Sequence, residues 1–108
     1  MKEKPNITYI QDLAGSNENF KAKLIKILQN ELPLEKETYL ENFDTNNFEE
    51  AAQNVHKLKH KISILGLKKG YDLAEELEKS LNEQLPLNNL HKEFINLLQI
   101  MEDFVATL

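Results

Sequence analysis

Apolar side chains recur along most of this chain at the spacing of an α-helix. In the clearest run, between residues 48 and 65, successive apolar positions are three or four residues apart, which places them on one helix face. These positions are Phe48, Ala51, Val55, Leu58, Ile62 and Leu65. The pattern therefore predicts an amphipathic helix, with its apolar face in a core and its other face in solvent.

Residues at both ends of this stretch predict where the helix begins and ends. Asn46 is a suitable N-cap, and Glu49, three residues later, completes a capping-box pattern. At the other end, Gly66 suits the left-handed backbone conformation that closes many helices. We therefore expect the helix to begin after Asn46 and to end at about Leu65.

A short helix and a long one are predicted before this stretch. Residues 8–13 fit the short helix, and the long helix that follows is expected to reach about Glu41. Pro33 should kink the long helix without ending it, because Leu34 and Leu40 continue the apolar trace. One side of its first half carries Phe20, Leu24, Ile27, Leu28 and Leu32.

Two more helices are predicted after residue 66. One spans about residues 68–82, and the other begins at Asn89, after a loop that contains Pro86. Their apolar positions are Tyr71, Ala74, Leu77 and Leu81, and then Leu90, Phe94, Leu97, Met101, Phe104 and Leu108. Amphipathic helices with short connections pack as antiparallel neighbours. We therefore predict a single all-α domain over residues 1–108, an antiparallel four-helix bundle with a short additional N-terminal helix.

Composition and charge narrow the possible functions. The chain has no cysteine, which excludes disulfides, thiolate catalysis and cysteine-ligated zinc. Its formal net charge of −5 argues against nucleic-acid binding. No apolar run approaches the length of roughly 18 residues that a membrane span needs, and the first residues lack the apolar core of a signal peptide. We expect a cytoplasmic, monomeric protein.

His56 stands out because it lies away from the apolar face of its helix. At about 100° per residue it falls roughly 130° from the centre of that face, and Lys59 and His60 share its side. An exposed imidazole is nucleophilic near neutral pH. Lysines gather around it at positions 57, 59, 61, 68 and 69. Such a cluster would attract an acidic partner.

The residues around His56 resemble the signature of histidine-containing phosphotransfer (HPt) domains. That signature is roughly His-x-Leu-Lys-Gly with a second glycine ten residues after the histidine, matched here by His56, Leu58, Lys59 and Gly66. The resemblance extends over nearly the whole chain, because helices occur before and after the motif in the family's order. It implies that His56 accepts a phosphoryl group from one receiver-domain aspartate and passes it to another, and that Lys59 stabilises the phosphoryl charge.

The resemblance also implies which partners supply the chemistry. The chain has no glycine-rich phosphate loop or Walker sequence, so it should not bind ATP. The expected partners are the receiver domains of a hybrid sensor kinase and of a response regulator, whose acidic pocket would hold Mg²⁺. The chain would then be a phosphocarrier with no cofactor and no enzymatic turnover of its own.

One position departs from the family pattern, and other outward positions are assigned to partner docking. His60 replaces the usual glycine, where it can crowd a partner, hydrogen-bond the phosphoryl group or point to solvent. Gln53, one turn before His56, is a candidate hydrogen-bonding neighbour. Ser63 and Ile64 continue the outward face, and Ile64 is predicted to be an exposed apolar anchor for a receiver domain.

Two alternative functions remain open from the sequence. The first is a helical adaptor of HPt-like fold that binds partners without being phosphorylated. The second is a metal-binding bundle, because His56 and His60 are four residues apart on one helix and can share a metal ion, although further ligands are then needed. His91 has no motif around it and is expected at the surface.

Overall fold

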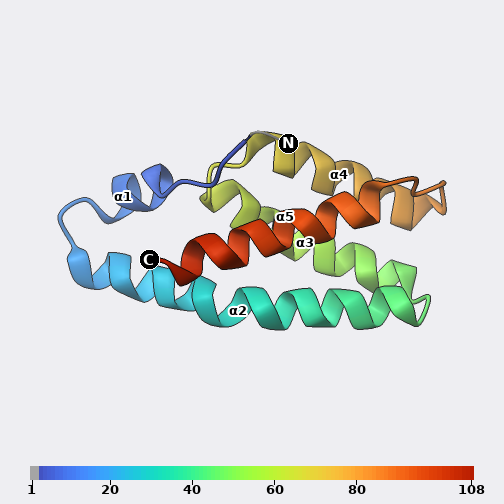
Figure 1. The fold of residues 1–108 in the computed structure, drawn as a ribbon, viewed down its shortest axis with the longest axis horizontal. Helices are drawn as coiled ribbons and strands as arrows, with labels where there is room; N and C mark the ends of the chain where they lie inside the picture. The colour runs from blue at the N-terminus through green and yellow to red at the C-terminus, as the bar shows by residue number, and fades with distance from the viewer. Residues whose placement is uncertain (1–2) are drawn as a thin grey trace.

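The computed structural model describes residues 3–108, in which five helices and no strands occur. The helices are α1 (Thr8–Ala14), α2 (Glu18–Asp44), α3 (Phe48–Ile64), α4 (Lys68–Glu83) and α5 (Leu90–Ala106). The four long helices run alternately in opposite directions, and α1 lies at one end of the bundle, beside the start of α2 (Figure 1). The predicted all-α bundle with a short N-terminal helix is therefore confirmed. None of the helices in residues 3–108 combines the length and apolarity that crossing a membrane requires.

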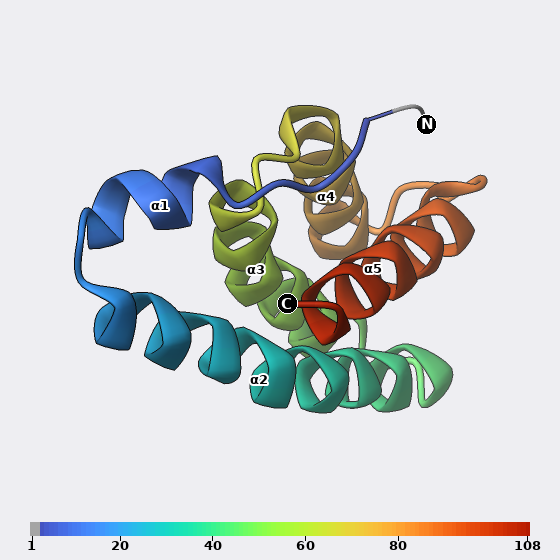
Figure 2. The same cartoon turned by 60° about the vertical axis from the view of Figure 1, so that its left-hand side comes forward.

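The apolar face predicted for α3 lies in the core. Ala51, Val55, Leu58, Ile62 and Leu65 are all fully buried, and Phe48 packs partly buried against them. In Figure 2, α3 lies between α2 and α4, so its buried face is covered from several sides. Because the apolar face of α3 is buried, the opposite face of the helix is exposed to solvent.

Helix α2 continues past Pro33, as predicted, and ends at Asp44, beyond the predicted end. Phe43, one turn after Tyr39, still packs against the core, which explains the extra turn. The predicted apolar side of α2 is partly wrong, because Phe20, Ile27 and Leu34 are exposed. The buried residues of α2 are Leu28, Leu32 and Tyr39. Ile27 is the neighbour of Leu28 and is therefore rotated by about 100° away from the buried face.

The predicted capping box at the start of α3 is wrong. The N-cap is Asn47, whose side chain makes no capping hydrogen bond. Asn46 has a left-handed backbone with φ of 61°, and its N–H donates to the carbonyl of Phe43. It therefore belongs to the turn that closes α2, where asparagine tolerates this conformation. The predicted role of Gly66 is confirmed, because its φ of 74° is left-handed directly after α3.

Residues before α1 cross the connection between α3 and α4. The N–H of Asn6 donates to the carbonyl of Leu65 at 2.9 Å. The carboxylate of Glu3 accepts hydrogen bonds from the backbone N–H groups of Lys69 and Gly70, at 3.0 to 3.1 Å. The N-cap of α4 is Leu67, which has no polar side chain, so Glu3 supplies the acceptor that this helix start lacks.

His91 is not the surface residue that the sequence predicted. Its Nδ1 lies 2.8 Å from the hydroxyl of Tyr39, and its ring stacks on Phe43 with centroids 3.6 Å apart. Burial raises the pKa of the Tyr39 hydroxyl, which therefore stays a neutral donor. Burial also lowers the pKa of His91, an effect that the negative charge of Asp44 partly offsets. The neutral imidazole is thus the form that the fold prefers.

We expect the burial of His91 in its neutral form to make the protein less stable in mild acid than near neutral pH. The pKa of His91 in the folded state lies below its unfolded value of about 6.5, so the unfolded chain takes up the proton first. The stability is fully present above that unfolded value and is lost as the pH falls through the folded pKa. Urea midpoints at several pH values should therefore fall less steeply below neutral pH in His91→Gln than in the parent. The carboxylates are the same in both proteins, so an identical pH dependence would contradict this role of His91.

Candidate functional site

His56 lies in the middle of α3 with its side chain 58% exposed. Its neighbours Val55 and Leu58 are fully buried and hold this part of the helix against the core. The rigid apolar face therefore fixes the direction in which the imidazole points. The exposed position predicted for His56 agrees with the structure.

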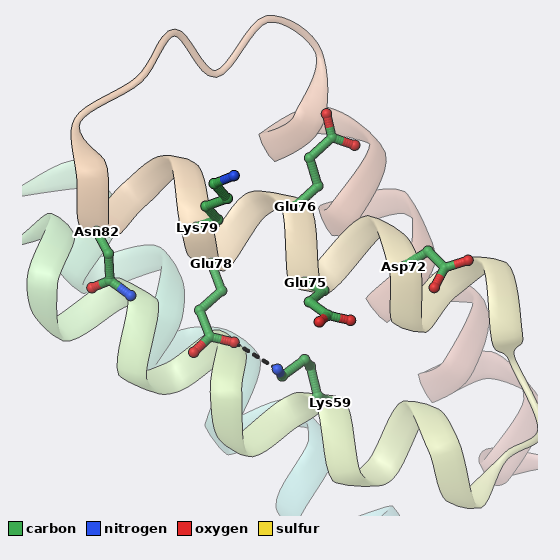
Figure 3. Close-up of a pocket in the computed structure, with 7 residues that line it drawn as sticks. All are labelled: Lys59, Asp72, Glu75, Glu76, Glu78, Lys79 and Asn82. Carbon is green, nitrogen blue, oxygen red and sulfur yellow. Dashed lines mark ion pairs between the residues drawn. The ribbon is translucent and has the colours of Figure 1, made fainter.

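A carboxylate from α4 contacts His56. The Nδ1 atom of His56 lies 3.1 Å from Oε2 of Glu78, and Oε1 of the same carboxylate lies 2.9 Å from Nζ of Lys59. In Figure 3, Glu78 points from α4 toward Lys59 on α3, and a dashed line marks this ion pair. Sequence reasoning missed Glu78, because it is 22 positions from His56 and only the packing of α4 on α3 brings the two together.

The Glu78 contact selects one form of the imidazole. An ionised carboxylate can only accept hydrogen bonds, so the neutral His56 ring that satisfies it carries its hydrogen on Nδ1. The other nitrogen, Nε2, then has the free lone pair. The hydrogen bond that one ring nitrogen makes determines which of the two nitrogens carries the hydrogen. The contact with Glu78 therefore leaves Nε2 as the nucleophilic atom.

Lys59 is not a free surface cation, contrary to the expectation from the sequence. Its side chain is only 12% exposed, and its ammonium lies 5.3 Å from the ring centroid of Tyr71 as well as contacting Glu78. The hydrogen bond to Glu78 is the main cause that raises the pKa of Lys59. In this structure Lys59 therefore holds Glu78 in place, on the Nδ1 side of His56.

The predicted cluster of lysines is partly neutralised by glutamates. Lys61 is 13% exposed and pairs with Glu31 at 2.9 Å and with Glu35 at 2.8 Å. Together with the pair between Lys59 and Glu78, this leaves only the lysines at positions 57, 68 and 69 exposed. The hollow beside the site is lined mainly by acidic residues of α4 (Figure 3), namely Asp72, Glu75, Glu76 and Glu78. The positive field around His56 is therefore weaker than the sequence predicted.

The remaining site residues of the prediction divide into exposed and packed positions. His60 is exposed, and its ring stands edge-on to that of His56 at 87°, with centroids 5.9 Å apart. Gln53 and Ser63 are also exposed on α3. The outward position predicted for Ile64 is wrong, because this residue is half-buried and packs against the core.

The misplacement of Ile64 has a tertiary cause. Ile64 is the last residue of α3, where the segment before α1 crosses and Asn6 bonds to Leu65. That end of α3 is therefore not a free helix face, as the helical wheel assumes. The docking role suggested for Ile64 loses the exposed position on which it was based.

The described side chains near His56 and His60 provide few ligands for a metal ion. Within residues 3–108, no group of three or more His, Cys, Asp or Glu side chains is placed to hold one. His56 and His60 remain a pair, and the nearest carboxylate, Glu78, is already bonded to Lys59. The metal-binding alternative therefore gains no further ligand from the tertiary structure.

Comparison with known proteins agrees with the geometry around His56. No curated protein and no solved structure matches the chain. The family model of the Hpt domain matches residues 11–107, which is nearly the whole chain and includes His56, Lys59 and Gly66. The match covers α2 to α5 and most of α1, so it concerns the complete bundle. The chain therefore belongs to the Hpt domain family.

Proposed function

We propose that this chain is a phosphorelay intermediate that carries a phosphoryl group on Nε2 of His56 between the aspartates of two receiver domains. Histidine phosphotransfer in phosphorelays is the function of Hpt domains in general, and receiver domains are their partners. The observation that carries the proposal is the contact of His56 with Glu78, which occupies Nδ1 and leaves Nε2 as the nucleophilic atom of an exposed side chain.

The first transfer step follows from this geometry. The lone pair of His56 Nε2 attacks the phosphorus atom of the receiver's phosphoaspartate, and a P–N bond forms. The P–O bond to the aspartate breaks, and its electron pair leaves with the carboxylate. The hydrogen on Nδ1 stays, so the phosphorylated ring becomes positively charged.

Glu78 is placed to stabilise that charge. Its carboxylate accepts the Nδ1 hydrogen bond of His56, and a positive ring strengthens this bond into a charge-assisted one. A buried carboxylate orients and stabilises the imidazolium of serine proteases in the same way. In the reverse direction, the P–N electron pair returns to Nε2 when a second aspartate attacks phosphorus, so one carboxylate serves both transfers.

The receiver domain supplies the other parts of the reaction. Phosphoryl transfer needs positive charge near the three equatorial oxygens of its transition state. Around His56, Lys59 and Lys61 are already paired with glutamates, and the sequence has no phosphate-binding loop. We therefore assign the Mg²⁺ site and the accepting or donating aspartate to the partner, and we regard the chain as a phosphocarrier.

A transfer assay with purified receiver domains tests this function. We expect radiolabel to pass from a phosphorylated receiver domain to the chain, and from the isolated labelled chain to a second receiver domain. The label on the chain should be lost in acid and retained in base, as expected of a P–N bond. Receiver domains that bind the chain without passing label to it would contradict the proposal and favour the adaptor alternative.

A further inference from the structure

A phosphoryl group on Nε2 of His56 would place its negative charge on the side of the ring that faces away from Glu78, toward solvent. The Nδ1 side of the ring is occupied by the Glu78 carboxylate, which repels phosphoryl oxygens. The phosphoryl oxygens therefore need hydrogen-bond donors on the outer side of α3. Which side chains can act as donors there follows from their other contacts.

The lysines of α3 are poorly placed for this task. Lys59 and Lys61 are held by glutamates and have side chains only 12% and 13% exposed. Lys57 is exposed, but it is the next residue after His56, and adjacent residues do not face each other on a helix. Thus none of the three lysines combines a free ammonium with a position on the His56 face.

His60 has both properties. It is one turn after His56, on the same face of α3, and its side chain is exposed. Within residues 3–108, its imidazole has no hydrogen-bond or ion-pair partner. Its ring stands edge-on to the His56 ring with centroids 5.9 Å apart, so the two imidazoles are close neighbours on this face.

We infer that His60 donates a hydrogen bond to the phosphoryl group on His56 and lengthens the lifetime of the phosphohistidine. This inference rests on the proposed function of His56. Hydrolysis breaks the P–Nε2 bond: a water oxygen attacks phosphorus, the bonding pair returns to Nε2, and the water loses a proton. In the loose transition state the P–Nε2 bond has lengthened and the phosphoryl group has moved away from the His56 ring. Because His60 is fixed on the same helix as His56, its hydrogen bond fits the intact phosphohistidine better than this transition state, and hydrolysis slows.

The lifetime can be measured without any receiver domain. The full chain is phosphorylated with phosphoramidate, the donor is removed, and the phosphohistidine signals are followed by phosphorus NMR. The signal of phospho-His56 is the one that is absent from His56→Gln treated in the same way. Parent, His60→Ala, His60→Gln and Lys57→Ala are compared, the last as a control that removes an exposed charge beside His56.

We expect phospho-His56 to hydrolyse about fivefold faster in His60→Ala, the effect of losing one hydrogen bond. His60→Gln keeps a hydrogen-bond donor of different reach and should lie between His60→Ala and the parent, and Lys57→Ala should match the parent. Equal or longer lifetimes in His60→Ala would overturn the inference while leaving the proposed function intact. Failure of a phosphorylated receiver domain to label His56 would instead overturn the proposed function.

Discussion

Replacing His56 with glutamine is expected to abolish phosphoryl transfer from a phosphorylated receiver domain to this chain. Glutamine is close in size and polar, but its amide nitrogen has no free lone pair and cannot attack phosphorus. The fold should persist, because the His56 side chain is 58% exposed and surface substitutions usually change stability by no more than about 0.5 kcal/mol. Radiolabel on the chain measures the transfer, and a urea midpoint measures the stability.

His60→Gln is the matched control for this experiment. It makes the same exchange one turn further along α3, at another exposed histidine, and should still accept the phosphoryl group, although the label is then lost somewhat faster than from the parent. Both variants keep His91, which is partly buried between Tyr39 and Phe43. Persistent acid-labile label on His56→Gln would mean that His56 is not the acceptor of the receiver's phosphoryl group.

Removing the Glu78 carboxylate is expected to slow phosphoryl acceptance about tenfold, which corresponds to the loss of one hydrogen bond to a charged group. In Glu78→Ala the His56 ring loses the acceptor that keeps hydrogen on Nδ1, together with the charge that stabilises the phosphorylated ring. The loss stays moderate because water can reach an exposed imidazole and replace part of the contact. Single-turnover transfer from a phosphorylated receiver domain measures the rate.

Two further variants separate the tautomer effect from the charge effect. Glu78→Gln keeps an amide oxygen that accepts from Nδ1 but carries no charge, so its rate should lie between those of the parent and Glu78→Ala. Glu76→Gln removes a charge from the same helix at an exposed position that points away from Lys59 in Figure 3, and should leave the rate near that of the parent. Parent-like transfer in Glu78→Ala would exclude Glu78 from the mechanism.

Local periodicity was enough to predict the bundle and the accessible histidine. The apolar positions of α3 repeat at helical spacing, and burying that face turns His56 outward. The turn at Gly66 was likewise predictable, because a left-handed backbone after a helix favours glycine. These features depend on residues within one helix, whose relative directions follow from a repeat of 3.6 residues per turn.

Local periodicity does not predict contacts between helices. Glu78 is 22 positions from His56, and Glu3 caps α4 from 66 positions away, so neither contact has a local signal. The wheel placed Lys59 with His56, but the acidic side chains of α4 determined that its ammonium turns to Glu78. His91 and Ile64 were misplaced for the same reason, since burial depends on which neighbouring segment covers a residue. Helical spacing thus specifies the direction of each side chain from its own helix axis, whereas its charge partners and burial follow from how the helices pack.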